Sequence, residues 1–157
     1  KRLGVKATND RWTQLILRLK DGHRSAADEC LPYIKRVLLP HHIVIAMPSH
    51  TSGPCRSTLA YIANQLAPLC RGDRTHAFVR TQTIPKSSMV APGLRPDDDV
   101  HYTSLAVTNP ADLIGSDVLL LDDVITRGST MRGAMRRLYE AGCNSVTCVG
   151  MAKTAIE

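Results

Sequence analysis

The sequence has few aromatic residues and no long hydrophobic run. Phe, Trp and Tyr make up 4% of its 157 residues, so aliphatic side chains and Met must supply most of the packing in a core. No apolar stretch approaches the roughly 20 residues that a membrane-spanning helix needs, and no signal-peptide pattern opens the chain. We therefore expect no membrane partner, although a chain that begins with Lys1 leaves a start further upstream open.

Cysteine pairs at metal-binding or redox spacing are also missing. The cysteines are odd in number and form neither a C-x-x-C pair nor a zinc-ligand spacing. Such a set fits reduced, mostly buried thiols in a cytoplasmic protein better than a disulfide framework, and no position stands out as a catalytic cysteine. The five are Cys30, Cys55, Cys70, Cys143 and Cys148.

The length suits one hydrophobic core rather than two. We find no internal repeat, low-complexity segment or linker, so residues 1–157 are predicted to form a single domain. Apolar residues at helical spacing predict helices over residues 12–19 and 25–37, within an N-terminal extension over residues 1–40. A core domain is predicted over residues 43–154.

Strand-like and helix-like segments alternate along the predicted core. Alternation of this kind predicts an α/β fold with a doubly wound, mainly parallel sheet and helices on both faces. Helical spacing returns around residues 59–66, with Pro54 in the first turn, and around residues 131–138, before Gly142. The predicted strands cover residues 43–47, 76–79, 105–107, 117–121 and 145–151.

The most informative segment is residues 118–130. Four aliphatic residues, typical of a buried strand, lead directly into Asp122 and Asp123. Thr126, Arg127, Gly128, Ser129 and Thr130 then form a hydroxyl-rich turn that opens a helix. Backbone N–H groups at a helix N-terminus bind phosphate, and two carboxylates can accept hydrogen bonds from the vicinal hydroxyls of a sugar. The segment therefore predicts a ribose 5-phosphate site.

This segment resembles the signature of the type I phosphoribosyltransferases. In that family the acidic pair holds the ribose hydroxyls of phosphoribosyl pyrophosphate (PRPP), and the following loop wraps its 5′-phosphate. The resemblance implies the first role, and a catalytic one, for Asp122 and Asp123. It implies the second role for Thr126, Arg127, Gly128, Ser129 and Thr130. It further implies the family fold with a small N-terminal helical hood, and Mg²⁺ as cofactor, which the acidic pair meets only indirectly through PRPP.

A second loop extends the resemblance beyond the signature. Family members bind pyrophosphate at a loop after the first core strand, which here covers residues 47–53. The resemblance implies that Ser49, His50 and Thr51 contact PRPP, together with Ser52 and Gly53. His50 is also an acid–base candidate. Taken without the resemblance, the same residues fit a connection that only caps the next helix.

The irregular segment over residues 80–104 is long for a structureless connection inside a domain, which favours a lid or binding loop. The family has a flexible loop here that closes over PRPP. The resemblance implies that Arg80, Lys86 and Arg95 reach pyrophosphate, and leaves open a homodimer in which they do so across the interface. The acids at positions 97–99 fit a Mg²⁺ site or a solvated loop tip, and we favour the loop tip.

The predicted function is transfer of a phosphoribosyl group from Mg²⁺-bound PRPP to a nitrogen nucleophile, with pyrophosphate release. Enzymes acting on 6-oxopurines usually carry Asp where this chain has Thr126, which argues against that acceptor. Parts of the chain resemble orotate phosphoribosyltransferases, amidophosphoribosyltransferases and small competence-protein-F-like proteins. The alternative is a catalytically silent PRPP- or nucleotide-sensing regulator that binds nucleic acid or a protein partner, which the net charge of +6 favours slightly. A hydrolase of ribosyl phosphates is a third, weaker hypothesis.

Overall fold

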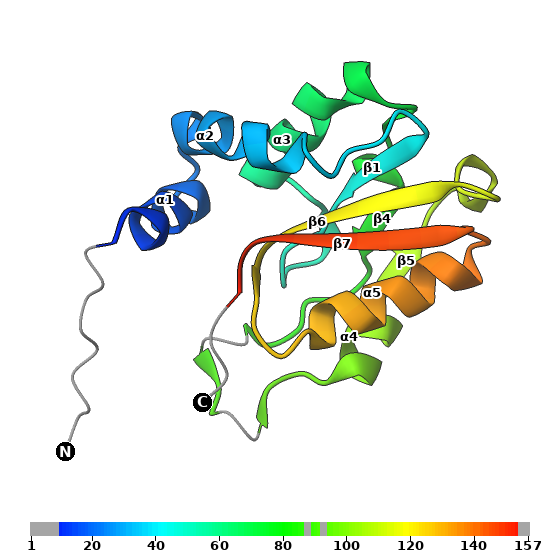
Figure 1. Ribbon diagram of the computed structural model, residues 1–157. Coiled ribbons are helices and arrows are strands. Elements are labelled where there is room, and N and C mark those ends of the chain that lie inside the picture. Colours follow the sequence, from blue (N-terminus) through cyan, green and yellow to red (C-terminus); the bar gives the residue numbers. More distant parts are fainter. Residues whose placement is uncertain (1–9, 87–88, 92–93, 154–157) are drawn as a thin grey trace.

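The computed structural model describes residues 10–86, 89–91 and 94–153 and has a parallel four-stranded sheet at its centre (Figure 1). The strand order is β3 (Gly72–Asp73), β1 (His42–Ala46), β6 (Asp117–Ile125) and β7 (Ser145–Lys153). All neighbours pair in parallel, which confirms the α/β fold with a mainly parallel sheet. Residues 1–9 of the predicted extension and Thr154 of the predicted core lie outside the described residues. Within those ranges, no helix combines the length and apolar character of a membrane span.

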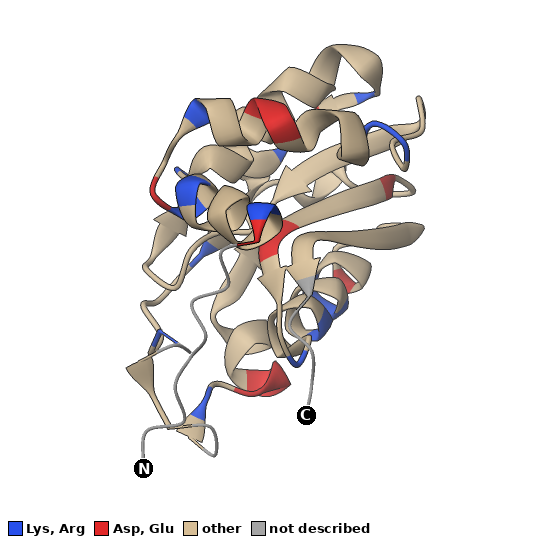
Figure 2. Ribbon diagram, turned by 60° about the vertical axis from the view of Figure 1, so that its left-hand side comes forward, with Lys and Arg blue, Asp and Glu red and all other residues tan. Residues whose placement is uncertain are grey.

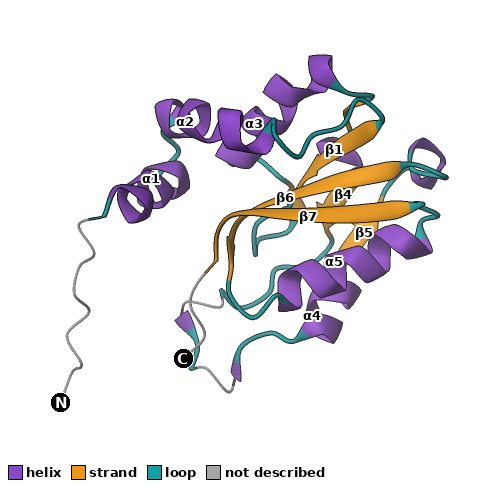
Figure 3. Cartoon of the chain, in the orientation of Figure 1, coloured by secondary structure: helices purple, strands orange, loops and turns teal. Residues whose placement is uncertain are grey.

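Helices cover both faces of this sheet, as Figure 1 and Figure 3 show. One layer contains α1 (Arg11–Lys20), α2 (Arg24–Ile34) and α3 (Thr58–Leu66), and the other contains α4 (Asp98–Thr103) and α5 (Ser129–Glu140). Short 3₁₀ helices occur at Ala67–Leu69, Thr75–Ala77 and Pro110–Asp112. The doubly wound arrangement predicted from the alternation of strands and helices is therefore confirmed.

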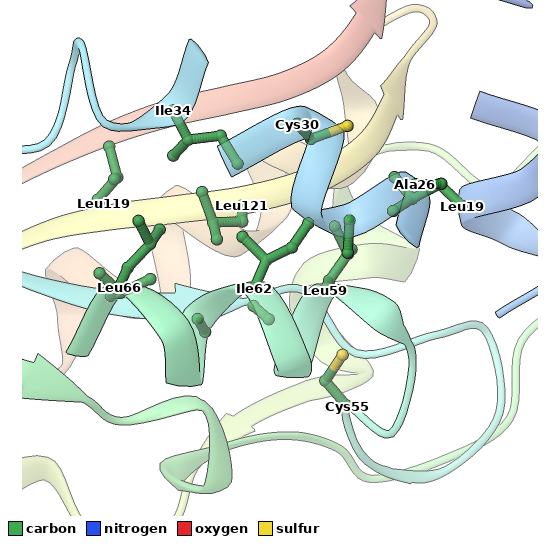
Figure 4. Close-up of a cluster of buried hydrophobic side chains, with 14 of the residues drawn as sticks. Leu19, Ala26, Cys30, Ile34, Cys55, Leu59, Ile62, Leu66, Leu119 and Leu121 are labelled. Atoms are coloured by element: carbon green, nitrogen blue, oxygen red, sulfur yellow. The ribbon is translucent and has the colours of Figure 1, made fainter. Parts of the chain in front are cut away.

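The aliphatic run of β6 forms the boundary between two apolar clusters. Successive strand residues point to opposite faces, so Leu119 and Leu121 pack with α1, α2 and α3, whereas Val118 and Leu120 pack with α5. All of these side chains are fully buried. Figure 4 shows the first cluster, with Leu59, Ile62 and Leu66 of α3 directed at β6. A strand buried on both faces needs apolar residues at every position, which explains the unbroken run.

The two N-terminal helices belong to the first helical layer. Asp10 caps α1 by accepting a hydrogen bond from the Thr13 N–H at 2.9 Å. The α2 helix ends at Ile34 rather than at the predicted residue 37. Pro32 lies inside its last turn, where a proline cannot donate a backbone hydrogen bond, and the chain continues as turns closed by Arg36 and Val37. A hood over an acceptor site stays a prediction.

A separate antiparallel sheet corrects two sequence expectations. β2 (Gly53–Pro54), β4 (Phe78–Arg80) and β5 (Leu105–Val107) pair with one another, so the strands predicted at 76–79 and 105–107 lie outside the parallel sheet. The first of them begins only at Phe78, because the residues before it form the 3₁₀ helix Thr75–Ala77. Pro54 is not in a helix, because it forms part of the two-residue strand β2 and α3 begins only after the cap residue Ser57. A residue without an N–H fits a short edge strand.

The last part of the segment predicted to be irregular forms the helix α4. Asp97 is its cap and accepts a hydrogen bond from the Val100 N–H at 3.0 Å, while Asp98 and Asp99 lie in its first turn. These two acids pair with Arg132 and Arg136 of α5. The run over residues 97–99 is therefore a helix start, where carboxylates are favoured by the helix dipole, and the expected loop tip is wrong.

Close contact between α4 and α5 depends on Gly133. A Cβ atom at this position would lie 2.7 Å from the Asp98 carbonyl oxygen and 2.7 Å from the His101 Cβ. Backbone groups cannot yield to such an overlap without a shift of the whole helix. The two helices therefore approach as closely as they do because α5 has no side chain at residue 133.

We predict that Gly133→Ala destabilises the protein, although alanine is a better helix former by about 1 kcal/mol. Overpacking should lower the free energy of unfolding by roughly 1–3 kcal/mol, measured by urea denaturation. Tyr139→Ala, at an exposed position of the same helix, serves as control and should change stability by less than about 0.5 kcal/mol. A Gly133→Ala protein as stable as the wild type would contradict the packing argument.

Candidate active site

The candidate site lies where the connections of the parallel sheet change direction. From β1 the chain proceeds to β3 on one side, whereas β6 leads to β7 on the other. Ligands of open α/β sheets bind outside the carboxyl ends of the strands at such a switch point. A cavity of about 360 Å³ opens there. Its polar and charged lining residues are Lys20, Ser49, His50, Ser57, Arg80, Lys86, Arg95, His101, Asp122, Asp123, Thr126 and Thr130.

Asp122 and Asp123 lie inside β6 rather than after its end. The strand continues to Ile125 because β7 pairs with it beyond the aliphatic run, with Asp122 opposite Gly150 and Val124 opposite Ala152. Each carboxylate accepts a hydrogen bond from the next backbone N–H, at 2.9 Å for Asp122 and 2.6 Å for Asp123. Both side chains line the cavity, so the acidic pair is held by the sheet itself.

The two carboxylates have different electrostatic surroundings. Burial raises the pKa of Asp122 to about 7, and the neighbouring charge of Asp123 acts in the same direction. Asp123 is more accessible and pairs with Lys20 of α1, with 3.4 Å between Nζ and Oδ2. Lys20 thus joins the N-terminal helices to the acidic pair.

The segment after β6 turns around the start of α5. Gly128 has a φ of 78°, in the left-handed region that favours glycine, and no side chain caps the helix. First-turn N–H groups are therefore available to an anion. Thr126 and Thr130 line the cavity, whereas Arg127, Gly128 and Ser129 form the turn without lining it. The Arg127 carbonyl accepts a hydrogen bond from Arg132 at 2.8 Å.

The loop after β1 contributes Ser49 and His50 to the cavity, and Thr51 lies beyond its lining. The Ser49 and Thr51 hydroxyls are 2.7 Å apart and share a hydrogen bond. The His50 carbonyl accepts a hydrogen bond from the Ile84 N–H at 2.9 Å. This loop is therefore tied to the segment that follows β4.

The three basic residues predicted for a flexible loop all line the cavity, but Arg80 is not a loop residue. It is the last residue of β4 and is 2% exposed. Its guanidinium donates to the Ser49 carbonyl through Nε and to the Ser104 hydroxyl through a terminal nitrogen, each at 2.5 Å. Burial lowers the pKa of Arg80 to about 10, and the charge of Asp122 opposes this shift. Arg80 is thus a fixed cation of the cavity wall.

Lys20 and His101 line the cavity, but no feature of the sequence indicated that either belongs to the site. Lys20 belongs to a segment that reads only as an amphipathic helix, and it reaches the cavity because α1 packs beside the strand ends. His101 lies in the segment expected to be irregular, and α4 places its Nε2 3.2 Å from the Thr130 hydroxyl. Both positions result from contacts between distant parts of the chain.

The raised pKa of Asp122 predicts an unusual dependence of stability on pH. The folded protein holds this proton more tightly than the unfolded chain, so the contribution of Asp122 to stability falls as pH rises from about 4 to about 7. We expect Asp122→Asn to raise the free energy of unfolding at pH 8 by about 1–4 kcal/mol, with the gain disappearing near pH 4. Urea titrations across this range provide the measurement.

Asp117→Asn on the same strand is the matched control. Hydrogen bonds from Ser145 and Asn144 lower the pKa of Asp117, so its stabilisation is present above its ordinary pKa and lost as pH falls. The control should therefore gain nothing at pH 8. A similar absence of gain in Asp122→Asn would contradict the electrostatic description of the acidic pair.

Comparisons with known proteins agree with this geometry. Residues 62–155, more than half of the chain, match the family described as "Phosphoribosyl transferase domain". Uracil phosphoribosyltransferases from Paenarthrobacter aurescens and Pseudarthrobacter chlorophenolicus are 29% and 30% identical over 70 residues, 44% of this chain and 33% of each relative. The chain thus spans about a third of the length of these relatives.

A solved structure described as the allosteric regulatory enzyme of purine biosynthesis has a similar fold. It superimposes with a TM-score of 0.51 at 18% identity, over 83% of this chain and 25% of that one. At this identity the likeness concerns the fold alone, whereas the match over residues 62–155 concerns the sequence and includes the acidic pair and the turn that follows it. The chain belongs to the phosphoribosyl transferase domain family.

Proposed function

We propose that the protein is a phosphoribosyltransferase that binds Mg²⁺-PRPP and transfers its phosphoribosyl group to a nitrogen nucleophile. The observation that carries this proposal is the meeting, in one cavity, of the acidic pair on β6 and the uncapped start of α5. A diol-binding pair of carboxylates beside a phosphate-binding helix end matches the two ends of a ribose 5-phosphate. Family membership supports the same assignment.

In this proposal each end of the sugar has its own protein partner. The carboxylates of Asp122 and Asp123 accept hydrogen bonds from the 2′ and 3′ hydroxyls. The N–H groups of the turn over residues 126–130 and the Thr126 and Thr130 hydroxyls bind the 5′-phosphate. Lys20 forms an ion pair with Asp123, so the ribose hydroxyls have to compete with Lys20 for this carboxylate.

The pyrophosphate is assigned to the remaining polar wall. The cations of this wall are Arg80, Lys86 and Arg95, and their positive charge suits a polyanion. Arg80 is buried, and both of its described hydrogen bonds are to neutral oxygens. The charge of Asp122 offsets part of the cost of burying Arg80, and the fixed positive charge of Arg80 also suits an anionic ligand.

The reaction breaks the bond from C1′ to the pyrophosphate oxygen and forms one from C1′ to the acceptor nitrogen, which loses a proton. Negative charge grows on the leaving pyrophosphate, and Arg80, Lys86 and Arg95 are disposed to stabilise it electrostatically. Positive charge grows on the ribose, beside the two carboxylates. The chemistry needs no protein nucleophile.

Mg²⁺ is proposed to enter together with the pyrophosphate. The described part of the chain has no group of three or more His, Cys, Asp or Glu side chains that could hold a metal ion by itself. In this proposal Asp122 and Asp123 meet the ion only through the bound substrate. When bound, Mg²⁺ would neutralise charge on the departing pyrophosphate.

The acceptor is proposed to be a nitrogen heterocycle other than a 6-oxopurine. This chain has Thr126 at the position where enzymes acting on 6-oxopurines usually carry an Asp. The curated relatives are uracil phosphoribosyltransferases, which makes uracil the first acceptor to test. The acceptor would enter beside Lys20, where α1 borders the cavity.

We predict that replacing both acids with asparagine abolishes binding of Mg²⁺-PRPP. Isothermal titration should show micromolar affinity for the wild type and at least a hundredfold loss for Asp122→Asn/Asp123→Asn, because neutral amides accept weaker hydrogen bonds from the diol. Asp117→Asn, on the same strand but outside the cavity, should bind as the wild type does. Equal affinity in the double variant would overturn the ribose assignment.

Turnover distinguishes an enzyme from a PRPP sensor. We expect pyrophosphate release from Mg²⁺-PRPP in the presence of uracil and none above background with hypoxanthine, measured by a coupled pyrophosphate assay. Release with hypoxanthine but not uracil would contradict the acceptor assignment. Tight PRPP binding without release for any base would favour the sensing regulator.

A further inference from the structure

His101 is a buried polar residue in the wall of the cavity. It is 4% exposed and lines the cavity beside Thr130. Its Nε2 lies 3.2 Å from the Thr130 Oγ1, and its Nδ1 has no hydrogen-bond partner among the described residues. Thr130 is in the first turn of α5, where the proposed function puts the 5′-phosphate. The histidine therefore contacts a hydroxyl that the proposed function assigns to the phosphate.

The position of His101 relative to Thr130 is held by the packing of two helices. Arg132 of α5 donates two hydrogen bonds to the Asp98 carboxylate, at 2.6 and 3.0 Å. Arg137 donates to the Tyr102 carbonyl at 3.0 Å, and Gly133 allows the backbones to touch. The histidine thus sits on a rigid support, which is what a residue that orients another side chain requires.

The environment keeps His101 neutral at physiological pH. Burial lowers its pKa to about 4, and the positive charge of Arg80 on β4 adds to this shift, while Asp97 and Asp98 of its own helix oppose it. A neutral imidazole has one N–H donor and one acceptor nitrogen. Which nitrogen holds the proton therefore decides what the Thr130 hydroxyl can do.

Only one of the two tautomers serves a phosphate ligand. If Nε2–H donates to the Thr130 oxygen, the threonine keeps its hydroxyl hydrogen for a phosphate oxygen, and Nδ1 is left as an unpaired acceptor. In the other tautomer the threonine gives its hydrogen to Nε2, and a buried Nδ1–H lacks an acceptor. Orphaned buried N–H donors are rarer than under-used acceptors, so the geometry favours the first arrangement.

We infer that His101 is a positioning residue that donates from Nε2–H to the Thr130 hydroxyl and thereby directs the hydroxyl hydrogen of Thr130 at the 5′-phosphate. This inference rests on the proposed function, because it takes the start of α5 as the phosphate site. His101 itself need not touch the substrate. Its effect on affinity must then pass through the Thr130 hydroxyl.

The test is a double-mutant cycle with D-ribose 5-phosphate as the probe, measured by isothermal titration. His101→Phe and Thr130→Val should each weaken binding about five- to tenfold, the size of one hydrogen bond. The double variant should be no weaker than Thr130→Val alone, because the two residues act through one hydroxyl. Losses that multiply in the double variant would overturn the inference.

Two conservative variants separate positioning from packing. The amide nitrogen of His101→Gln can replace Nε2–H, so this variant should bind within about twofold of the wild type. His101→Asn offers its amide at the δ position and should bind as weakly as His101→Phe. Equal binding by the Gln and Asn variants, with equal stability in urea, would assign His101 a packing role only.

The nitrogen spectrum of the free protein tests the inference independently of any ligand. Long-range ¹H–¹⁵N correlations at pH 7 should show His101 protonated at Nε2 and not at Nδ1. Protonation at Nδ1 would overturn the inference even if the proposed function holds. Failure of the wild type to bind ribose 5-phosphate would overturn the proposed function, while the tautomer would still decide whether His101 donates to Thr130.

Discussion

Parallel pairing of β1 with β6 fixes both the layered packing of the helices and the position of the candidate site. Ile43 to Ala46 lie opposite Val118 to Leu121 in an unbroken register, and these residues are buried on both faces of the sheet. A slip of one residue would exchange the two apolar clusters, so the register is strongly specified. Because the two strands are parallel, their carboxyl ends meet at one edge. The loop after β1 and the acidic pair of β6 therefore face the same cavity.

The site is built at a cost to the stability of the sheet. Asp122 continues a buried strand, where burial and Asp123 both oppose its ionisation. A sequence optimised for stability alone would not put two adjacent carboxylates there, and such local conflicts are typical of functional positions. Lys20 offsets part of the repulsion from outside the sheet, which links the N-terminal helices to the state of the acidic pair. Figure 2 shows Lys and Arg interspersed with Asp and Glu over the helical layers, whereas the lining of the cavity contains more Lys and Arg residues than carboxylates.

Both sheets and both helical layers contribute residues to the lining of the cavity. The antiparallel sheet delivers Arg80, which holds the Ser49 carbonyl and thus the loop after β1. The packing of α4 against α5 holds His101 beside Thr130. Polar groups that lie far apart in the sequence are therefore held in place by direct hydrogen bonds between different elements. Preorganisation of this kind suits a reaction whose catalysis is mainly electrostatic.

Elements whose signal is local could be predicted from the sequence alone. The aliphatic run, the two acids, the Gly turn and the amphipathic α5 lie within one continuous segment, so periodicity and cap chemistry were sufficient to predict these elements, while their role as a ribose 5-phosphate site stays a prediction. The position of β4 and β5 outside the parallel sheet could not be predicted in this way, since strand partners are selected by long-range pairing and burial rather than by the strand's own residues. The acids at positions 97–99 begin a helix rather than form a loop tip, and the arginines that pair with Asp98 and Asp99 lie on α5. Lys20 and His101 reach the cavity for the same reason: their positions result from helix packing across the whole fold, which no local pattern contains.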